Sequence, residues 1–238
     1  MPPARSSDQL IRTVATTAST NDDVALLARE GAPEGLWVRA EQQTGGRGRQ
    51  GRSWLSPLGN LYASTLVRLT AGDPPASTLS LVAGVALHQV AQPFAPEVRL
   101  MLKWPNDLLA DGAKLAGILL ERHEDAVVAG FGVNLAKHPT DLERPATSLR
   151  ALTGSAPEAA LFVEQLAASF ADWLARWRGS GLPAIRIAWL AKAHPIGTAL
   201  SSSGVDGLFD GLDEQGALRL RRADGSVDVI QAGDVFLI

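Results

Sequence analysis

The most constraining feature of this sequence is a series of strand-like segments between residues 98 and 135, joined by short turns. In residues 98–103, aliphatic side chains occupy alternate positions and Lys103 falls on the opposite face. Trp104-Pro105 ends this segment. After a turn-rich stretch over residues 106–113, further strand patterns cover residues 114–121 and 126–135. Parallel neighbours would need a crossover of a dozen or more residues, so these connections predict an antiparallel meander.

Helical patterns flank this meander. A capped helix with acidic residues in its first turn begins near Asn21 and ends at Gly31. Buried-helix patterns cover residues 77–90 and 157–178, with a stop at Gly179 or Gly181 and a short helix at 185–193; strand patterns cover 36–40 and 61–67. This order predicts an α+β fold, with a mixed or antiparallel sheet and packed helices, rather than a parallel doubly wound sheet.

The pattern changes at about residue 195, where short β segments separated by glycines begin. Such spacing is typical of a small barrel. We therefore expect two domains, a larger one over residues 1–194 and a small C-terminal β-barrel over 195–238.

Composition excludes several classes of protein. The 238 residues include no cysteine, which excludes disulfides, thiolate nucleophiles and cysteine-based metal sites, and the four histidines show no ligand spacing. The net charge of −3 argues against a broad nucleic-acid-binding face. Residues 1–9 lack a secretory signal pattern and no apolar run approaches membrane-spanning length, so we expect a cytoplasmic protein without membrane contact.

Residues 45–54, GGRGRQGRSW, concentrate positive charge in this acidic chain. Glycines allow close backbone approach to a ligand, and guanidinium groups suit phosphate or carboxylate. A solvated flexible loop is the alternative, but the strands expected on both sides anchor it. The loop also satisfies GxGxxG, yet residues 56–60 break any following helix and the acid expected about twenty positions later is missing. No Gly-Lys-Ser/Thr sequence follows, which excludes a P-loop.

A second group of polar residues, KWPND at 103–107, is followed by KLAGIL at 114–119. Two lysines flank one predicted hairpin, with Asn106 and Asp107 at its tip. The alternative interpretation is structural: the lysines are solvated strand ends and Asn106-Asp107 forms the turn.

Together with the arginine loop, these segments resemble the central domain of biotin protein ligases, in which GRGRxGR, KWPND and KxxGIL occur in this order. The similarity extends from Ser19 through Asn134 and into the small β domain. It implies a biotin/lipoate ligase-like catalytic domain and an SH3-like barrel. The implied enzyme activates biotin with MgATP to biotinyl-5′-AMP and transfers biotin to a lysine of a biotin carboxyl carrier protein, from acetyl-CoA carboxylase or a related carboxylase. Because the Ser19 segment begins so early, we expect no N-terminal operator-binding module.

The resemblance assigns site residues by position. The residues implied in catalysis are Lys114, Asp107, Arg49 and Lys103. Those implied in biotin binding are Ser19, Thr20, Asn21, Gln43, Arg47, Gly48, Arg49, Trp54, Lys114 and Gly117. Those implied in ATP binding are Arg47, Arg49, Arg52, Asn106, Lys114, Gly130, Gly132 and Asn134. Asp107 is the candidate Mg²⁺ ligand or the proton acceptor for the incoming lysine, and both roles stay open.

One departure from the family pattern concerns the last strand, where relatives often carry an arginine and this chain ends Phe236-Leu237-Ile238. Three other functions compete: a lipoate ligase or octanoyl transferase of the same fold, a noncatalytic regulator that binds biotin or nucleotide, and an RNA-binding module. The arginine loop and KWPND favour biotin over lipoate or octanoate. The presence of the lysines and Asp107 favours an enzyme over a noncatalytic regulator. An RNA-binding module would need clustered aromatics and a basic face, which the sequence lacks. The acceptor carboxylase and the choice between monomer and homodimer are left open.

Overall fold

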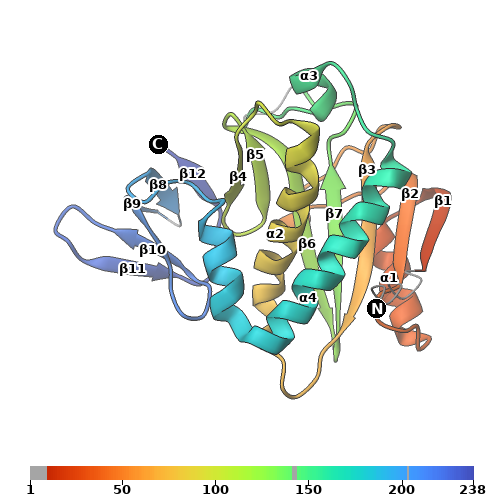
Figure 1. Cartoon of the computed structure of the whole chain (residues 1–238), viewed down its shortest axis with the longest axis horizontal. Coiled ribbons are helices and arrows are strands. Elements are labelled where there is room, and N and C mark those ends of the chain that lie inside the picture. Colours follow the sequence, from red (N-terminus) through yellow and green to blue (C-terminus); the bar gives the residue numbers. More distant parts are fainter. Residues whose placement is uncertain (1–9, 141–143, 203) are drawn as a thin grey trace, which may run out of the picture.

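The computed structural model describes residues 10–140, 144–202 and 204–238; residues 1–9, where we expected no secretory signal, lie outside it. Its centre is a seven-stranded sheet in the order β1-β2-β3-β7-β6-β5-β4 (Figure 1). The strands are β1 (Ile11–Thr17), β2 (Trp37–Gln43), β3 (Leu61–Arg68), β4 (Leu100–Lys103), β5 (Asp107–Ala110), β6 (Ala113–His123) and β7 (Ala126–Val133).

The predicted meander is confirmed, because β4, β5, β6 and β7 pair antiparallel in sequence order. One detail was wrong: residues 107–110, expected within a turn, form the short strand β5. The sequence patterns also missed β1, which pairs parallel with β2 through a crossover that contains α1 (Thr20–Arg29). The sheet is therefore mixed.

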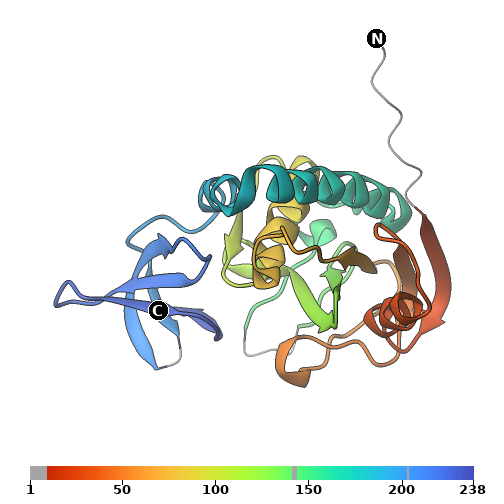
Figure 2. The same cartoon turned by 90° about the horizontal axis from the view of Figure 1, so that it is seen from below.

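Two helices cover one face of this sheet, as Figures 1 and 2 show: α2 (Leu79–Ala91) and α4 (Ala159–Leu190). Trp37 stacks on Phe131 and meets Phe170 of α4 edge to face, so aromatic rings fill this layer. Gly181 interrupts α4 with φ of 70°, at a position where we expected a stop. The remaining helical segments are α3 (Leu149–Thr153) and the 3₁₀ turns η1 (Arg49–Gly51), η2 (Ala76–Thr78) and η3 (Gln92–Phe94).

The opposite face of the sheet is only partly covered. There α1 packs Val24, Ala25 and Ala28 against alternate residues of the strands, including Leu66 and Val128. Because successive strand side chains point to opposite faces, the residues beyond the end of α1 on this face stay free to form a site.

The C-terminal part is a five-stranded antiparallel sheet in the order β11-β10-β9-β8-β12. Its strands are β8 (Ala199–Ser202), β9 (Val205–Leu212), β10 (Leu218–Arg221), β11 (Val227–Ile230) and β12 (Val235–Leu237). Leu218 and Val235 belong to the same apolar core as α2 and α4. Our boundary at residue 194 falls in the connection between α4 and β8 and stays a prediction.

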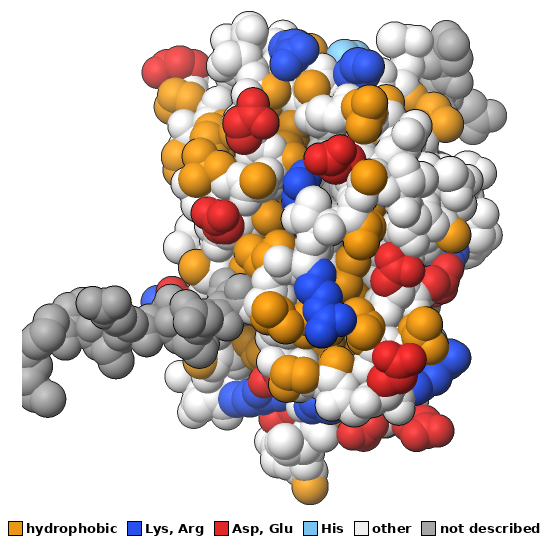
Figure 3. Space-filling model, turned by 90° about the vertical axis from the view of Figure 1, so that its right-hand side faces the viewer, with side chains coloured by type: hydrophobic (Ala, Val, Ile, Leu, Met, Phe, Trp, Pro, Cys, Tyr) orange, Lys and Arg blue, Asp and Glu red, His pale blue; other side chains and the backbone are white. Residues whose placement is uncertain are grey.

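Strand β1 forms the edge of the large sheet at the right of Figure 1. Seen from that side, hydrophobic side chains lie among charged groups of both signs (Figure 3). Within the described residues, no helix is long and apolar enough to cross a membrane.

Candidate active site

The floor of the site is one row of residues that crosses five strands. Tyr62 pairs with Gly132, Gly132 with Gly117, Gly117 with Asp107, and Asp107 with Lys103. Paired residues share a face of a sheet, and this face is the one opposite α2 and α4. The row places two glycines between an aromatic and a pair of charged side chains, which leaves a hollow beside the charges.

The glycines of this face accommodate side chains that lie directly on the strands. A Cβ added to Gly132 would lie 2.5 Å from Cε2 of Trp54, and one added to Gly130 would lie 2.1 Å from Oδ1 of Asn21. Any larger residue at either position would displace these groups. The sequence marked both glycines as site residues, and the geometry gives each a steric reason.

At one end of the hollow, hydroxyl and amide groups form a connected network that ends on the carboxylate of Glu121. Thr20 Oγ1 contacts Ser64 Oγ at 2.7 Å and donates to Gln43 Oε1 at 3.2 Å. Ser64 Oγ donates to Asn21 Oδ1 at 2.6 Å, and Asn21 Nδ2 donates to Glu121 Oε2 at 2.5 Å. Ser19, which precedes α1, is buried in the same region. This end offers both donors and acceptors within a small volume.

The arginine loop connects β2 to β3 and folds as a small hairpin over the hollow. Trp54 N donates to Gly46 O at 2.9 Å, Gly48 N donates to Arg52 O at 2.7 Å, and Arg47 and Ser53 form an isolated antiparallel bridge. The turn at η1 contains Gln50 with φ of 57°, in the left-handed region. The loop is therefore an ordered element held by its own backbone bonds.

Cationic side chains gather at the other end. Asp107 lies between Lys114 Nζ at 2.6 Å and Lys103 Nζ at 3.7 Å. Burial lowers the pKa of Lys103, although the charge of Asp107 opposes this effect. Lys114 Nζ also lies 5.5 Å from the centre of the Trp54 ring. One carboxylate thus orients two ammonium groups toward the hollow.

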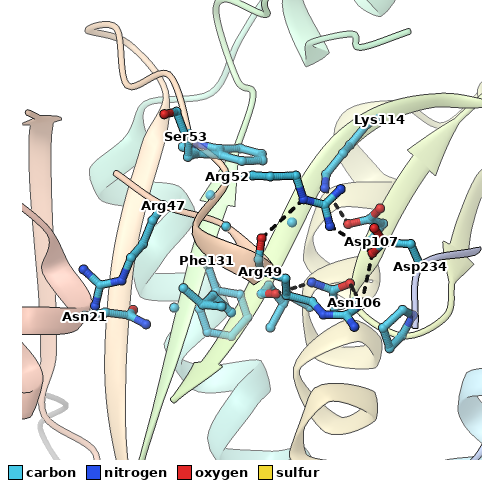
Figure 4. A pocket seen from close by; sticks show the side chains of 18 of the residues that line it. Asn21, Arg47, Arg49, Arg52, Ser53, Asn106, Asp107, Lys114, Phe131 and Asp234 are labelled. Atoms are coloured by element: carbon cyan, nitrogen blue, oxygen red, sulfur yellow. Dashed lines mark hydrogen bonds and ion pairs between the residues drawn. The ribbon is translucent and has the colours of Figure 1, made fainter. Parts of the chain in front are cut away.

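The C-terminal sheet completes this cationic end. Arg52 Nη2 donates to Asp234 Oδ1 at 2.9 Å (Figure 4). Arg49 Nη1 donates to Gly233 O at 3.0 Å. Burial opposes ionisation of Asp234, but the hydrogen bond and charge of Arg52 and the charge of Arg49 lower its pKa overall. Arg144, before α3, stacks over the ring of Phe236 at 3.9 Å. Asp234 and Arg144 were not predicted from the sequence.

These residues enclose a cavity of about 540 Å³. It is lined by every predicted site residue except Asn134, which is buried next to it with Nδ2 3.5 Å from the carbonyl oxygen of Lys114. The lining contains six cationic and two acidic side chains: Arg47, Arg49, Arg52, Lys103, Lys114 and Arg144 against Asp107 and Asp234. A net positive cavity in an acidic chain favours an anionic ligand.

The fold and this cavity define a class of protein. Residues 14–135 match the Biotin/lipoate A/B protein ligase family, and residues 204–238 match the Biotin protein ligase C terminal domain. The chain therefore belongs to the biotin/lipoate A/B protein ligase family.

Curated relatives support the same assignment. The chain is 40% identical to the biotin–[acetyl-CoA-carboxylase] ligase of Paracoccus denitrificans, over 94% of this chain and 98% of the relative. It is 36% identical to the corresponding ligase of Mycobacterium tuberculosis, over 93% and 86%. The biotin protein ligase of Aquifex aeolicus, in complex with biotin and ATP, has a similar fold, with a TM-score of 0.87 at 24% identity over 97% of this chain and 100% of that one. The resemblance and fold class inferred from the sequence are confirmed.

Proposed function

We propose that this protein is a biotin protein ligase that acts in two steps. In the first, a carboxylate oxygen of biotin attacks the α-phosphorus of ATP, the bond to the β-phosphate breaks, and pyrophosphate leaves. In the second, the ε-amine of an acceptor lysine attacks the acyl carbon; an amide forms, AMP leaves, and the amine loses a proton. The proposed acceptor is a biotin carboxyl carrier domain; the names of the curated relatives give acetyl-CoA carboxylase as their substrate, which supports a carrier domain of that enzyme.

The observation that carries the proposal is the division of one cavity into an end with hydroxyl and amide groups, where the charge of Arg47 is balanced by Asp22 and Glu121, and a cationic end. Adenylation brings the carboxylate of biotin against the α-phosphate, so two anions must approach each other. Fixed cations in a site shielded from water reduce this repulsion more than mobile counterions do. Arg49, Arg52, Lys103 and Lys114 are the groups proposed for this task.

The end with hydroxyl and amide groups suits the head group of biotin, a cyclic urea with two N–H donors and one carbonyl acceptor. The network of Thr20, Asn21, Gln43 and Ser64 supplies hydroxyl and amide groups of both kinds. We place Trp54 over the apolar part of the ligand. Its Nε1 is buried without a hydrogen-bond partner among the described residues and would lie 2.7 Å from a Cβ added to Gly132, so this edge of the indole faces the sheet.

Asp107 does not fit as a protein anchor for Mg²⁺, because two lysines already balance its charge. The described residues also contain no cluster of three or more His, Asp or Glu suited to a metal ion. We propose that Mg²⁺ arrives bound to the phosphates of ATP, as this ion commonly does. Asp107 then holds Lys114 in place, and its role as proton acceptor stays a prediction.

Pyrophosphate exchange into ATP tests the proposal with three carboxylic acids. Biotin should support exchange at least about a hundredfold faster than lipoate or octanoate at equal concentration, because a pocket that hydrogen-bonds a urea leaves buried polar groups unpaired with an alkyl chain. Faster exchange with lipoate would identify a lipoate ligase instead. No exchange with any acid, despite measurable biotin binding, would identify a noncatalytic binding protein. We place the reaction in the cytoplasm, where ATP is available.

A further inference from the structure

Arg47 differs from Arg49 and Arg52 because its guanidinium group pairs with two carboxylates, whereas Arg49 and Arg52 share one carboxylate, that of Asp234. The Nη1 and Nη2 of Arg47 donate to the two carboxylate oxygens of Asp22 at 2.7 and 2.6 Å. Its Nε and Nη2 also donate to Glu121 at 3.0 to 3.2 Å. All three guanidinium nitrogens are therefore engaged, and this pairing raises the pKa of Arg47.

These bonds direct Arg47 away from the cationic end. In Figure 4 its side chain extends toward Asn21, whereas Arg49 and Arg52 lie on the side of Asp234. The loop is thus fastened on opposite sides. One arm is tied to the first turn of α1 and to β6 through Arg47, and the other side is tied through Arg49 and Arg52 to the segment just before β12.

Glu121 joins this fastening to the polar network. Its Oε2 accepts a bond from Asn21 Nδ2 at 2.5 Å as well as one from Arg47 Nη2 at 3.1 Å. Asn21 is held from its other side by Ser64. A displacement of the loop arm would therefore release a carboxylate that orients Asn21.

We propose that Arg47 is a positioning residue: its clamp on Asp22 and Glu121 keeps the arginine loop closed over the acyl-adenylate and sets how long this intermediate stays bound. The inference rests on the proposed function. In this proposal the charge of Arg47 holds the loop closed rather than binding the ligand. The side chains of Arg47, Asp22 and Glu121 are 31%, 55% and 27% exposed, so salt should weaken the clamp.

Asp22→Asn tests the clamp, because Asp22 does not line the cavity and asparagine has nearly the same shape. Asp23→Asn is the matched control: it removes an acid from the same helical turn, but its carboxylate accepts from Thr17 Oγ1 instead. Adenylate is formed with labelled biotin, ATP and pyrophosphatase, and its dissociation is followed after a chase with unlabelled biotin. We expect dissociation to become about fivefold faster in Asp22→Asn and to stay unchanged in Asp23→Asn.

Salt provides a readout that a general loss of stability would not reproduce. Dissociation from wild type should accelerate from 50 mM to 1 M NaCl, whereas dissociation from Asp22→Asn should respond less because its ion pair is already lost. Equal acceleration by both substitutions would overturn the clamp in favour of an effect of the helix terminus. Slower dissociation from Asp22→Asn would also overturn it, because Arg47 would then act on the ligand directly.

A second measurement needs no adenylate and separates this inference from the proposed function. Hydrogen exchange in the ligand-free protein reports the opening of the loop through the amides of Gly48 and Trp54, which donate within the hairpin. Both should exchange faster in Asp22→Asn than in wild type and Asp23→Asn. Unchanged exchange would overturn the clamp, whereas absence of pyrophosphate exchange in wild type would overturn the proposed function and its adenylate but leave the clamp on the loop of the ligand-free protein standing.

Discussion

Lys114 makes a close contact to a carboxylate, and its side chain is partly exposed to solvent. A substitution at this position should therefore remove its charge with little loss of packing. Its Nζ lies 2.6 Å from Asp107, and a third of the side chain is exposed. Lys114→Ala should therefore lower biotin-dependent pyrophosphate exchange by about a hundredfold, equivalent to ~2.7 kcal/mol of transition-state stabilisation. The melting temperature should change by only a few degrees.

Two substitutions control this experiment. Lys114→Arg retains the charge and should recover part of the activity, and Lys137→Ala removes an exposed lysine outside the cavity. Exchange at the wild-type rate in Lys114→Ala would remove this lysine from the proposed mechanism.

Gly132 matters because it has no side chain. A Cβ at this position would lie 2.5 Å from Trp54, so Gly132→Ala should move the indole off the sheet and weaken biotin binding by at least tenfold in calorimetry. Gly179→Ala is the matched control, since nothing lies within 4 Å of its added Cβ and alanine favours the helix. Equal biotin affinity in both variants would contradict the proposed position of Trp54 over the ligand.

At the scale of elements, the sequence predicts those segments whose burial follows a regular pattern. The helical spacing of apolar residues located α4, and alternation located β4, because each has one well-covered face. The edge strand β1 has little packed against it and its burial does not alternate. In β5, three of four residues are buried in succession, so alternation is lost there too.

The same reasoning explains which parts of the site were predictable. The arginine loop and both lysines could be found from the sequence, because each lies in a motif that is continuous in the chain. Asp234 and Arg144 reach the cavity from separate elements, and neither lies in a recognisable pattern. The carboxylates that hold Arg47 are 25 and 74 positions away in the sequence, so only the folded chain brings them together.

A buried histidine at the contact between α2 and β4 should make the stability of the fold sensitive to acid. His88 is buried, with Nε2 3.1 Å from the carbonyl oxygen of Leu100; burial, assisted by the charge of Lys192, lowers its pKa from 6.5 to about 4. The unfolded state then binds more protons between these values, so stability is lost as pH falls from about 6.5 to 4. The full loss attributable to His88 is about 3 kcal/mol.

Urea unfolding between pH 7 and 4.5 checks this expectation. His88→Gln keeps an N–H donor for Leu100 but cannot titrate, so its unfolding free energy should fall less steeply with acid. Some slope should remain, because burial and the charges of Lys103 and Arg99 also lower the pKa of His194. Identical slopes in wild type and His88→Gln would show that His88 is not held neutral.

At the scale of the whole molecule, the two sheets share one apolar core and one cavity. Leu200, Phe209 and Leu218 belong to the same core cluster as α2 and α4, and Trp104 Nε1 donates to Gly216 O at 3.1 Å across the junction. Asp234 and Val235 line the cavity together with residues of the large sheet. A ligand that fills both ends of the cavity therefore contacts both parts of the chain.

This arrangement predicts how ligands stabilise the protein against heat. Biotin and ATP should each raise the melting temperature modestly, and together they should raise it by more than the sum. The adenylate makes both sets of contacts as one molecule and avoids a second loss of translational and rotational freedom. α,β-Methylene-ATP is the matched control, because it cannot lose pyrophosphate and should give only an additive shift with biotin. Excess pyrophosphate should reverse the extra shift by driving the adenylate back to ATP, and an additive shift with ATP itself would contradict adenylate formation in this cavity.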